Sequence, residues 1–527
     1  MSDFFKKADR PPISRKRRWS QLLSFLLLVT LTALFVEHWR GERALRAWKR
    51  QVTAQGEIFD PTKIWPASNL ANREFSNQLA QAVGKLPESL NKFAGLLAGL
   101  HLDGTGRADR GSKQASPTLS YEQNTSNTWQ QLEVAIQQSK PALETIRKLM
   151  QNPPRAMDVN VATRLDLDAL PNLADIRRSS QALHTAVIND LHQGDLNAAL
   201  ENLEALQGSV SVYADEPALV NSMIRVAVLG LSNDACWDAL QDERWTDSQL
   251  VRLQQVHHSG VLLAQVPKAV AAERIGRLHS LDRFASHNYQ TWIDRLAPIH
   301  RSFGSKAPEL DTANLNGAWR KWVFHPAWDY AWREQEELDY LHFSEQEMTI
   351  VREFVEREAW IITHEKLTAL RKSYRRPPAD WRFYRSIPLY DTLSEVIGGK
   401  RVELTECPYP DFSRAWFATA KNLTQHEMVI AVIALQRYQL REGKMPKALA
   451  ALVPEYLKAL PRDLMDGQPL RYRLNADGSF GLYSVGEDAQ DGGGDARPSE
   501  SNASQQKRDW WNGRDWVWPH ASPRPKT

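Results

Sequence analysis

Apolar residues are concentrated in one unbroken run near the start of the chain. Residues 19–36 form an 18-residue stretch without a charged side chain, which is close to the shortest helix that crosses a bilayer core. Trp19 and Trp39 bracket the run, as aromatic residues at membrane interfaces do. The pattern predicts a transmembrane helix over residues 19–37, with the lipid bilayer as its partner.

A cleaved signal peptide and a buried core helix are the alternatives for this run. Its end, residues 33–36, reads Ala-Leu-Phe-Val and lacks the small-x-small pattern of a cleavage site, so we favour an uncleaved anchor. Seven Lys and Arg residues precede the run, and five follow it within the next eighteen positions. This excess favours a cytoplasmic N-terminus. We expect a basic cytoplasmic tail over residues 1–18, an inner (cytoplasmic) membrane location and an extracytoplasmic body.

Beyond the anchor, apolar residues recur at helical spacing. Residues 42–55 look like a continuing basic helix that stops at Gly56, and residues 101–117 are rich in Gly, Ser and charge, as linkers are. We therefore assign residues 38–118 to a juxtamembrane stalk and linker. Residues 119–425 follow as a helical body.

Within this body, two stripes separated by Gly194-Asp195 predict an antiparallel helical hairpin. The first stripe is Leu173, Ile176, Leu183, Val187 and Leu191, and the second is Ala198, Ala199, Leu203 and Leu206. The segment 192–206 resembles one tetratricopeptide-type hairpin. No second copy follows at a 34-residue period, so a single hairpin is favoured over a repeat array.

Two Ser/Thr-x-x-Glu/Gln patterns indicate helix starts, because the first residue can cap the backbone N–H of the fourth while the fourth reaches back. One is Thr246 to Gln249 and the other is Ser344 to Glu347. Both are predictions about structure alone.

The pattern near the C-terminus changes from helix to strand. Residues 426–441 are helical in spacing and meet breakers at 443–446, and a short helix follows over 449–453. Alternating residues 470–474 and 479–485, joined by Asn475-Ala476-Asp477-Gly478, then predict a β-hairpin. The predicted fold class is mainly α, with an N-terminal transmembrane helix, a helical-hairpin body and a small C-terminal α+β module over residues 426–486.

Charge and cysteines narrow the function only a little. The chain has 66 basic and 63 acidic groups, a net charge of +3, so no nucleic-acid partner is expected. Basic and aromatic residues alternate over 371–385; they could contact bases or an anionic membrane, but Pro377-Pro378 favours an irregular connection pinned to the core. Cys236 and Cys407 could form one bridge or be two buried apolar thiols, and we favour the thiols.

A search for catalytic motifs gives a negative result. The chain contains no Gly-x-Ser-x-Gly elbow, no Gly-rich phosphate loop with Lys and no complete His-Glu-x-x-His, although His364-Glu365 and His426-Glu427 supply its first half. The pair His257-His258 lies in a helical stretch, where surface exposure is favoured over metal binding. We assign no catalytic or cofactor-binding residue and expect a protein that is not an enzyme.

The C-terminal elements resemble the C-terminal part of the major pseudopilin of type II secretion over roughly 90 residues. The matching segments are 435–438, 443–446, 449–460, 463–472 and 482–486. The whole chain also resembles a family of bacterial single-pass membrane proteins with a helical body and this ending, in which the segment 48–56, the hairpin and the final module occur in the same order. That resemblance implies an architecture and no activity.

Pseudopilins hold a calcium ion in the loop after this hairpin, and the resemblance implies the same here. The residues concerned are Asp488, Asp491, Asp495 and Asp515. Clustered carboxylates beside Gly492-Gly493-Gly494 suit calcium, which takes six to eight oxygen ligands; the alternative is a solvated acidic loop. We expect residues 487–527 to be an acidic, Gly-rich loop and flexible tail. The prepilin processing pattern is missing near the N-terminus, so polymerisation as a pilin is not expected.

Three hypotheses about function follow. The leading one is a membrane-anchored envelope protein that acts as a non-enzymatic scaffold or binding protein. The first alternative is an accessory component of a type II secretion or pilus-like system, with envelope or secretion-system proteins as partners. The second alternative is an envelope hydrolase, which requires a pocket lined by convergent polar groups.

Overall fold

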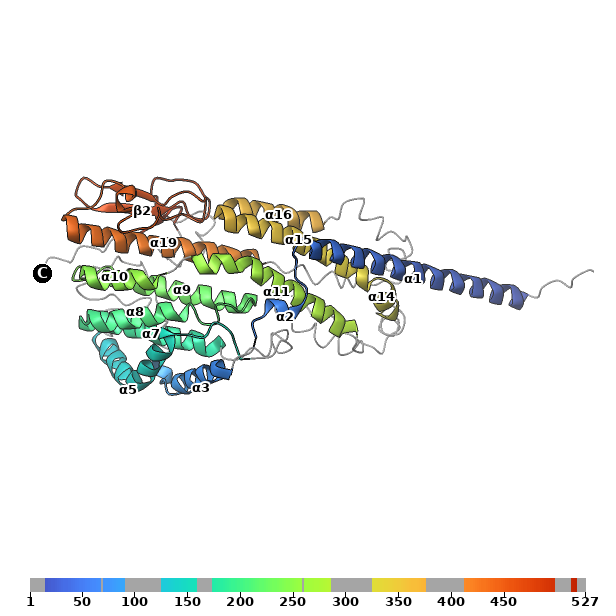
Figure 1. The fold of residues 1–527 in the computed structure, drawn as a ribbon, viewed down its shortest axis with the longest axis horizontal. Helices are drawn as coiled ribbons and strands as arrows, with labels where there is room; N and C mark the ends of the chain where they lie inside the picture. The colour runs from blue at the N-terminus through green and yellow to red at the C-terminus, as the bar shows by residue number, and fades with distance from the viewer. Residues whose placement is uncertain are drawn as a thin grey trace, which may run out of the picture. The chain divides into compact units, whose positions relative to one another are not determined.

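The computed structural model describes residues 15–67, 70–90, 125–158, 173–257, 260–285, 325–375, 412–497 and 513–518. The chain divides into two compact units. Unit 1 comprises residues 1–59, 277–343 and 379–409, and unit 2 comprises residues 60–276, 344–378 and 410–527. Both units are mainly helical in their described parts, and a small antiparallel sheet belongs to unit 2 (Figure 1).

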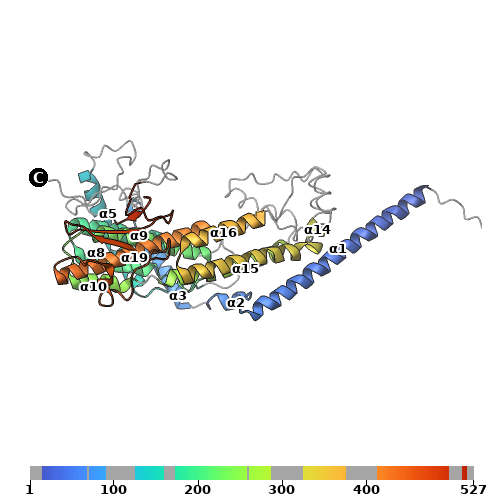
Figure 2. The same cartoon turned by 90° about the horizontal axis from the view of Figure 1, so that it is seen from above.

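Helix α1 (Arg15–Ala54) dominates unit 1 and is a single unbroken helix of 40 residues (Figure 2). An 18-residue window of it has a mean hydropathy of 1.9, and none of that window is buried. The predicted apolar helix is therefore present, and it is long and apolar enough to span a membrane. The stalk expected over residues 42–55 is the second half of the same helix, which ends just before Gly56, a residue with φ +94°.

The second half of α1 packs inside unit 1, against α14 (His325–Ala331) and the first part of α15 (Arg333–Arg357). Its buried residues are Glu37, Gly41, Leu45, Trp48 and Val52. Their spacing of three and four places them on one face of the helix. The small apolar core of unit 1 consists of Leu45, Trp48, Val52 and Leu341, with Phe59, Leu278 and Leu338 packed at its edge.

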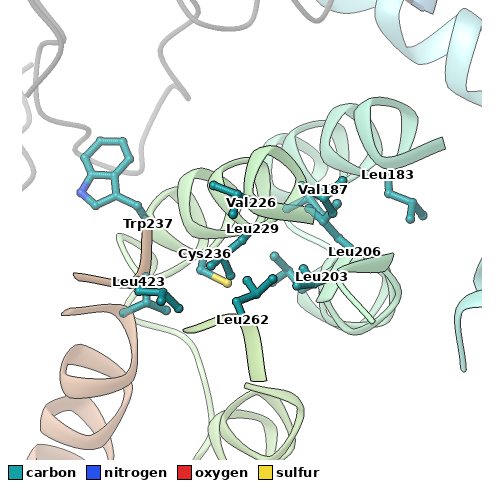
Figure 3. Packing of buried hydrophobic residues seen from close by; sticks show 14 of the residues in the cluster. Leu183, Val187, Leu203, Leu206, Val226, Leu229, Cys236, Trp237, Leu262 and Leu423 are labelled. Carbon is teal, nitrogen blue, oxygen red and sulfur yellow. The ribbon is translucent and has the colours of Figure 1, made fainter. Parts of the chain in front are cut away.

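Unit 2 contains most of the remaining helices. They are α2 (Pro61–Ile64), α3 (Leu70–Gly84), α5 (Thr125–Gln151), α7 (Leu173–Gln193), α8 (Leu196–Ser209), α9 (Leu219–Ala239), α10 (Asp247–Val256), most of α11 (Gly260–Ala285), α16 (Trp360–Arg375) and α19 (Ser413–Glu442). A continuous apolar core joins all of them except α2, and Figure 3 shows part of this core. It includes Leu183, Val187, Leu203 and Leu206 from the two predicted stripes.

The predicted hairpin is confirmed as α7 and α8. The first helix ends before Gly194, whose φ of +77° is natural for glycine. Asp195 then caps the second helix by accepting a hydrogen bond from the backbone N–H of Ala198 at 3.0 Å. The turn therefore combines the two residues that the sequence places there.

Of the two predicted helix starts, one is confirmed and one is wrong. Thr246 and Gln249 form a reciprocal capping box at the start of α10. Ser344, by contrast, lies inside α15 and is buried. Leu338 and Leu341 lie three residues apart just before it, so the helical apolar pattern runs through Ser344 and no helix start is needed there.

The C-terminal module has the predicted helix and β-hairpin. After α19 come a 3₁₀ helix, η5 (Leu449–Leu452), and the antiparallel strands β1 (Arg471–Leu474) and β2 (Phe480–Ser484). A third strand, β3 (Trp516–Val517), pairs with β2, so the sheet order is β1-β2-β3. This strand lies within the segment expected to be a loop and tail.

Some expectations fall on residues outside the described ranges. These are the linker at 101–117, most of the basic and aromatic segment at 371–385, His258 and Cys407. Residues 371–375 of that segment form the end of α16.

Candidate functional site

The C-terminal module is organised around a buried carboxylate that the motif search did not single out. Asp463 has no exposed surface. It accepts hydrogen bonds from the backbone N–H of Met465 (3.0 Å) and Val485 (2.9 Å) and from Ser484 Oγ (2.8 Å). Burial raises the pKa of Asp463 to about 6, although these hydrogen bonds oppose the shift. The carboxylate thus joins the turn before β1 to the end of β2.

Arg471 connects this buried group to the acidic loop. Its Nη1 lies 3.1 Å from Asp463 Oδ2, it also pairs with Asp466, and its Nε lies 3.7 Å from Asp491 Oδ2. The hydrogen bond to Asp466 raises the pKa of Arg471. One guanidinium therefore serves three carboxylates, and its fork geometry suits that role.

Among the four residues predicted to bind calcium, Asp515 is the most deeply placed. It is fully buried next to β3 and accepts backbone N–H groups from Gly492 (3.2 Å), Gly494 (2.6 Å) and Asp495 (2.8 Å). Successive N–H groups that converge in this way form an anion-binding concavity. Here the anion is the protein's own carboxylate, which fixes the Gly-rich loop to the third strand.

The other three aspartates have separate partners. Asp495 forms a bidentate pair with Arg497, both distances being 2.7 Å, and this pair lowers the pKa of Asp495 to about 2. Asp491 accepts from the backbone N–H of Gly493 and from Tyr483 Oη, which lower its pKa. Asp488 is exposed and accepts from the N–H of Gln490 at 3.0 Å.

Asp495 and Asp515 are the two predicted ligands that this arrangement brings close together. Gly492 lies between their side chains, because a Cβ at this position would lie 3.0 Å from Asp515 Oδ2 and 3.2 Å from Asp495 Cβ. Calcium would have to displace Arg497 from Asp495, because Arg497 engages both oxygens. Within the described ranges, no three acidic, histidine or cysteine side chains form a group that could hold a metal ion. The calcium site stays a prediction.

A buried polar cluster in unit 2 was missed by the sequence reasoning. Cys236 Sγ of α9 lies 3.5 Å from His257 Nε2, the rings of His257 and His426 are 4.8 Å apart, and His426 Nδ1 lies 3.1 Å from Asn233 Oδ1. The expectation that His257 is exposed is wrong, since only 7% of its surface is accessible. It lies at the C-cap of α10, where the backbone is extended.

The chemistry of this cluster argues against a nucleophile. Cys236 is a free, fully buried thiol, as expected for a thiol in the apolar core. Burial raises its pKa to about 12, so the thiol stays protonated at neutral pH and the reactive thiolate is not formed. A sequence signal did exist, because His426 falls within a stretch of α19 whose other members include the buried Met428 and Val429.

A second polar cluster lies in unit 1 where the apolar run of α1 ends. Glu37, the first charged residue after the run, is only 5% exposed. Its two carboxylate oxygens accept from Arg40 Nη1 and Gln335 Nε2, each at 2.8 Å. Further along the contact, Lys49 Nζ pairs with Glu337 at 2.5 Å. The hydrogen bond from Gln335 and the ion pair between Lys49 and Glu337 tie α1 to α15, and sequence alone gave no sign of them because the partners are almost 300 residues apart.

An aromatic contact reinforces the same place. The ring of His38 stacks on Tyr330 of α14, with centroids 4.6 Å apart and an interplanar angle of 18°. Gly41 permits close approach, since a Cβ there would lie 3.1 Å from Gln335 Cγ. One face of α1 at the end of the apolar run is therefore covered by polar and aromatic partners within unit 1.

Comparisons with known proteins give no relative to set beside these sites: no protein-family model, no curated protein and no solved structure matches the chain.

Proposed function

We propose that this protein is a membrane-anchored scaffold or binding protein of the bacterial envelope. In this proposal α1 crosses the inner membrane once through residues 19–37, the N-terminus is cytoplasmic, and the helical body is extracytoplasmic. The observation that carries the proposal is the division of one continuous helix into an exposed apolar half and a packed polar half.

The exposed half needs a covering that the described residues of unit 1 do not provide. Large apolar side chains lie in the open at Trp19, Leu22, Leu23, Phe25, Leu26, Leu27, Leu28, Val29, Leu31, Phe35 and Val36. A contiguous surface of this kind is unfavourable in water and marks contact with a membrane or another protein. Their distribution around the whole helix fits lipid on every side better than one partner surface.

The charges before the run support the orientation. Arg15, Lys16, Arg17 and Arg18 open α1, and its first turn has no acidic residue. Cations at a helix N-terminus oppose the helix dipole, so their placement brings no benefit to the helix itself. The tendency of Lys and Arg to stay in the cytoplasm accounts for them.

A binding role for the body is supported by what its polar groups do. Among the described residues, Asp463, Asp515 and Glu37 are held in structural contacts, and the thiol of Cys236 is kept protonated. The described polar clusters thus serve the packing of the fold. Candidate partners are envelope proteins or components of secretion systems.

The anchor is tested by charging its lipid-facing surface. Leu27 and Leu31 are 61% and 55% exposed, so Leu27→Arg with Leu31→Arg leaves the packed half of α1 untouched. Each arginine at mid-membrane costs roughly 3 kcal/mol on the insertion scale. We expect loss from the alkali-washed membrane fraction, while the control Leu27→Ile with Leu31→Ile stays there. Retention of the arginine variant in the membrane would argue against the span.

Orientation has its own test. Protease added outside intact spheroplasts should digest the body and leave a short N-terminal fragment in the membrane. Full protection of the body would reverse the orientation and leave the anchor itself intact.

The secretion-system alternative is supported by the ending of the chain, where a helix is followed by a hairpin as in the resemblance described above. Co-purification with pseudopilins from solubilised membranes is its test, and recovery as an isolated monomer would count against it.

The hydrolase alternative would gain support from hydrolysis of purified envelope material by the full-length protein. Loss of that activity on a single polar substitution in unit 2 would then identify the site.

We also propose that the acidic, Gly-rich loop of the C-terminal module binds a calcium ion. Titration calorimetry with calcium should show binding to the wild-type protein and none to Asp495→Asn with Asp515→Asn. Asp488→Asn is the matched control on the exposed part of the loop. No heat from the wild-type protein would remove calcium from the proposal and leave the anchor unaffected.

A further inference from the structure

We infer that unit 1 contains a juxtamembrane collar that lies in the headgroup region of the bilayer and contacts phospholipid. The collar is defined as α14 (His325–Ala331) with the first turns of α15, residues 333–338. This inference rests on the proposed function, because it presupposes that α1 spans the membrane.

The collar lies beside the end of the apolar run of α1. The apolar run ends at Val36, yet Ala33 and Leu34 within the run are already half-buried. Tyr330 of α14 stacks on His38, one turn later, and both views place α14 beside α1 (Figures 1 and 2). The collar therefore overlaps the last turn of the run and the first polar turn after it.

The apolar run of α1 is slightly shorter than the hydrocarbon core of a bilayer is thick. An 18-residue helix extends about 27 Å at about 1.5 Å per residue, whereas a bilayer core is about 30 Å thick. The run is therefore slightly short, so Glu37 and His38 fall at the boundary of the hydrocarbon. A carboxylate at this depth is costly unless it is paired and shielded.

The collar and Arg40 of α1 together supply that shielding. Gln335 and Arg40 occupy the two oxygens of Glu37, each at 2.8 Å, and only 5% of the residue stays accessible. Tyr330 covers the ring of His38. Glu37 is thereby enclosed in protein, which lets the helix sit in a membrane thicker than its apolar run.

Exposed aromatic side chains lie on α14 and on α1 near the end of the run. Tyr330 is 46% exposed and Trp39 is 51% exposed, and both have the amphipathic rings that gather at membrane interfaces. The guanidinium of Arg43 lies 5.2 Å from the Trp39 ring centre, where it can reach lipid phosphate while its stem stays on apolar surface. Two exposed aromatic rings, one of them with a cation beside it, fit the glycerol and phosphate region of a phospholipid leaflet.

The test measures the depth of spin labels on the full-length protein in phosphatidylcholine and phosphatidylglycerol vesicles. Cysteines are placed singly at Leu27, Tyr330, Pro326 and Val134 in a Cys407→Ser background. Cys236 can stay, because it is fully buried and its thiol is protonated. All four positions are exposed. Leu27 reports on the span, Val134 of α5 reports on water, and Pro326 tests α14 without removing the Tyr330 ring.

The readout is access to a water-soluble nickel reagent and to oxygen. At Tyr330 and Pro326 we expect nickel access roughly threefold lower than at Val134, with oxygen access between those of Val134 and Leu27, as for headgroup depth. Nickel access at both positions equal to that at Val134, with Leu27 protected, would overturn the collar and leave the anchor standing. Nickel access at Leu27 itself would overturn the anchor and the collar with it.

Discussion

The long helices α1 and α19 use apolar residues in opposite ways. The first half of α1 leaves most of its apolar side chains exposed, whereas α19 buries fourteen residues, including Val429, Val432 and Leu435, against helices and the sheet of unit 2. A helix that is apolar all round is suited either to a core or to a membrane. The flanking residues separate the two cases: four cations and a tryptophan begin α1, and a Gly C-cap with φ +67° ends α19.

The sharpest test of this contrast removes the same atoms from both helices. Leu435→Ala should lower the free energy of unfolding of unit 2 by about 3 kcal/mol, because it leaves a cavity in a closed core. Leu27→Ala, at a position 61% exposed, should leave that unfolding unchanged. Urea denaturation in mild detergent, followed by circular dichroism, measures both. An equal loss in the two variants would mean that α1 is part of the folded core.

A second prediction concerns the module that covers α19. Asp515→Ala removes the acceptor for three backbone N–H groups, and leaving buried donors unsatisfied costs about 2 kcal/mol. We expect faster proteolysis in the Gly-rich loop and detachment of β3, read out by amide hydrogen exchange in β2. Asp488→Ala, which loses one exposed hydrogen bond, is the control. Unchanged exchange in β2 of the Asp515 variant would contradict the role of Asp515.

A third prediction is a dependence of stability on pH in unit 2. Burial raises the pKa of both Asp190 and Asp463 to about 6, so the folded state holds these protons more tightly than the unfolded chain. Stability should therefore rise as pH falls from about 7 to about 5, by about 1 kcal/mol for each group. Asp190→Asn should reduce the slope without abolishing it, because burial also raises the pKa of Asp463 and of Glu273. A steeper slope in that variant would show that other groups dominate.

The smallest expected effect is at a helix start. Thr246→Ala removes the side-chain oxygen that caps α10 and should cost about 1 kcal/mol. Ser344→Ala is the informative partner, because Ser344 lies inside α15 and alanine favours a helix interior. We expect it to be close to neutral in thermal unfolding, and a loss as large as that of Thr246→Ala would indicate an unrecognised structural role.

Local sequence patterns predicted several elements of this fold correctly. The apolar run, the α7–α8 turn at Gly194-Asp195 and the capping box at Thr246 each depend on residues within one continuous segment, so the sequence carries them directly. The β1–β2 hairpin was predictable for the same reason, since Asn475 to Gly478 supply its turn.

The unpredicted features depend on distant partners. β3 is only two residues long and exists through its pairing with β2 and the N–H groups around Asp515. His257 is buried because α9 and α19 approach it. Glu37 and Gln335 are 298 positions apart in the sequence, and nothing in the sequence around either residue indicates that they pair. At the candidate site, the sequence showed the four clustered aspartates, but it did not show the buried Asp463 or the partners that occupy the aspartate oxygens.

The central claim is that α1 holds the chain in a bilayer, and the most direct measurement is the fate of the native protein after an alkaline wash of cell membranes. Mass analysis of the recovered product decides between the outcomes. The account predicts a membrane-retained chain that still contains residues 19–36. A product free in solution that begins downstream of residue 36 would contradict it.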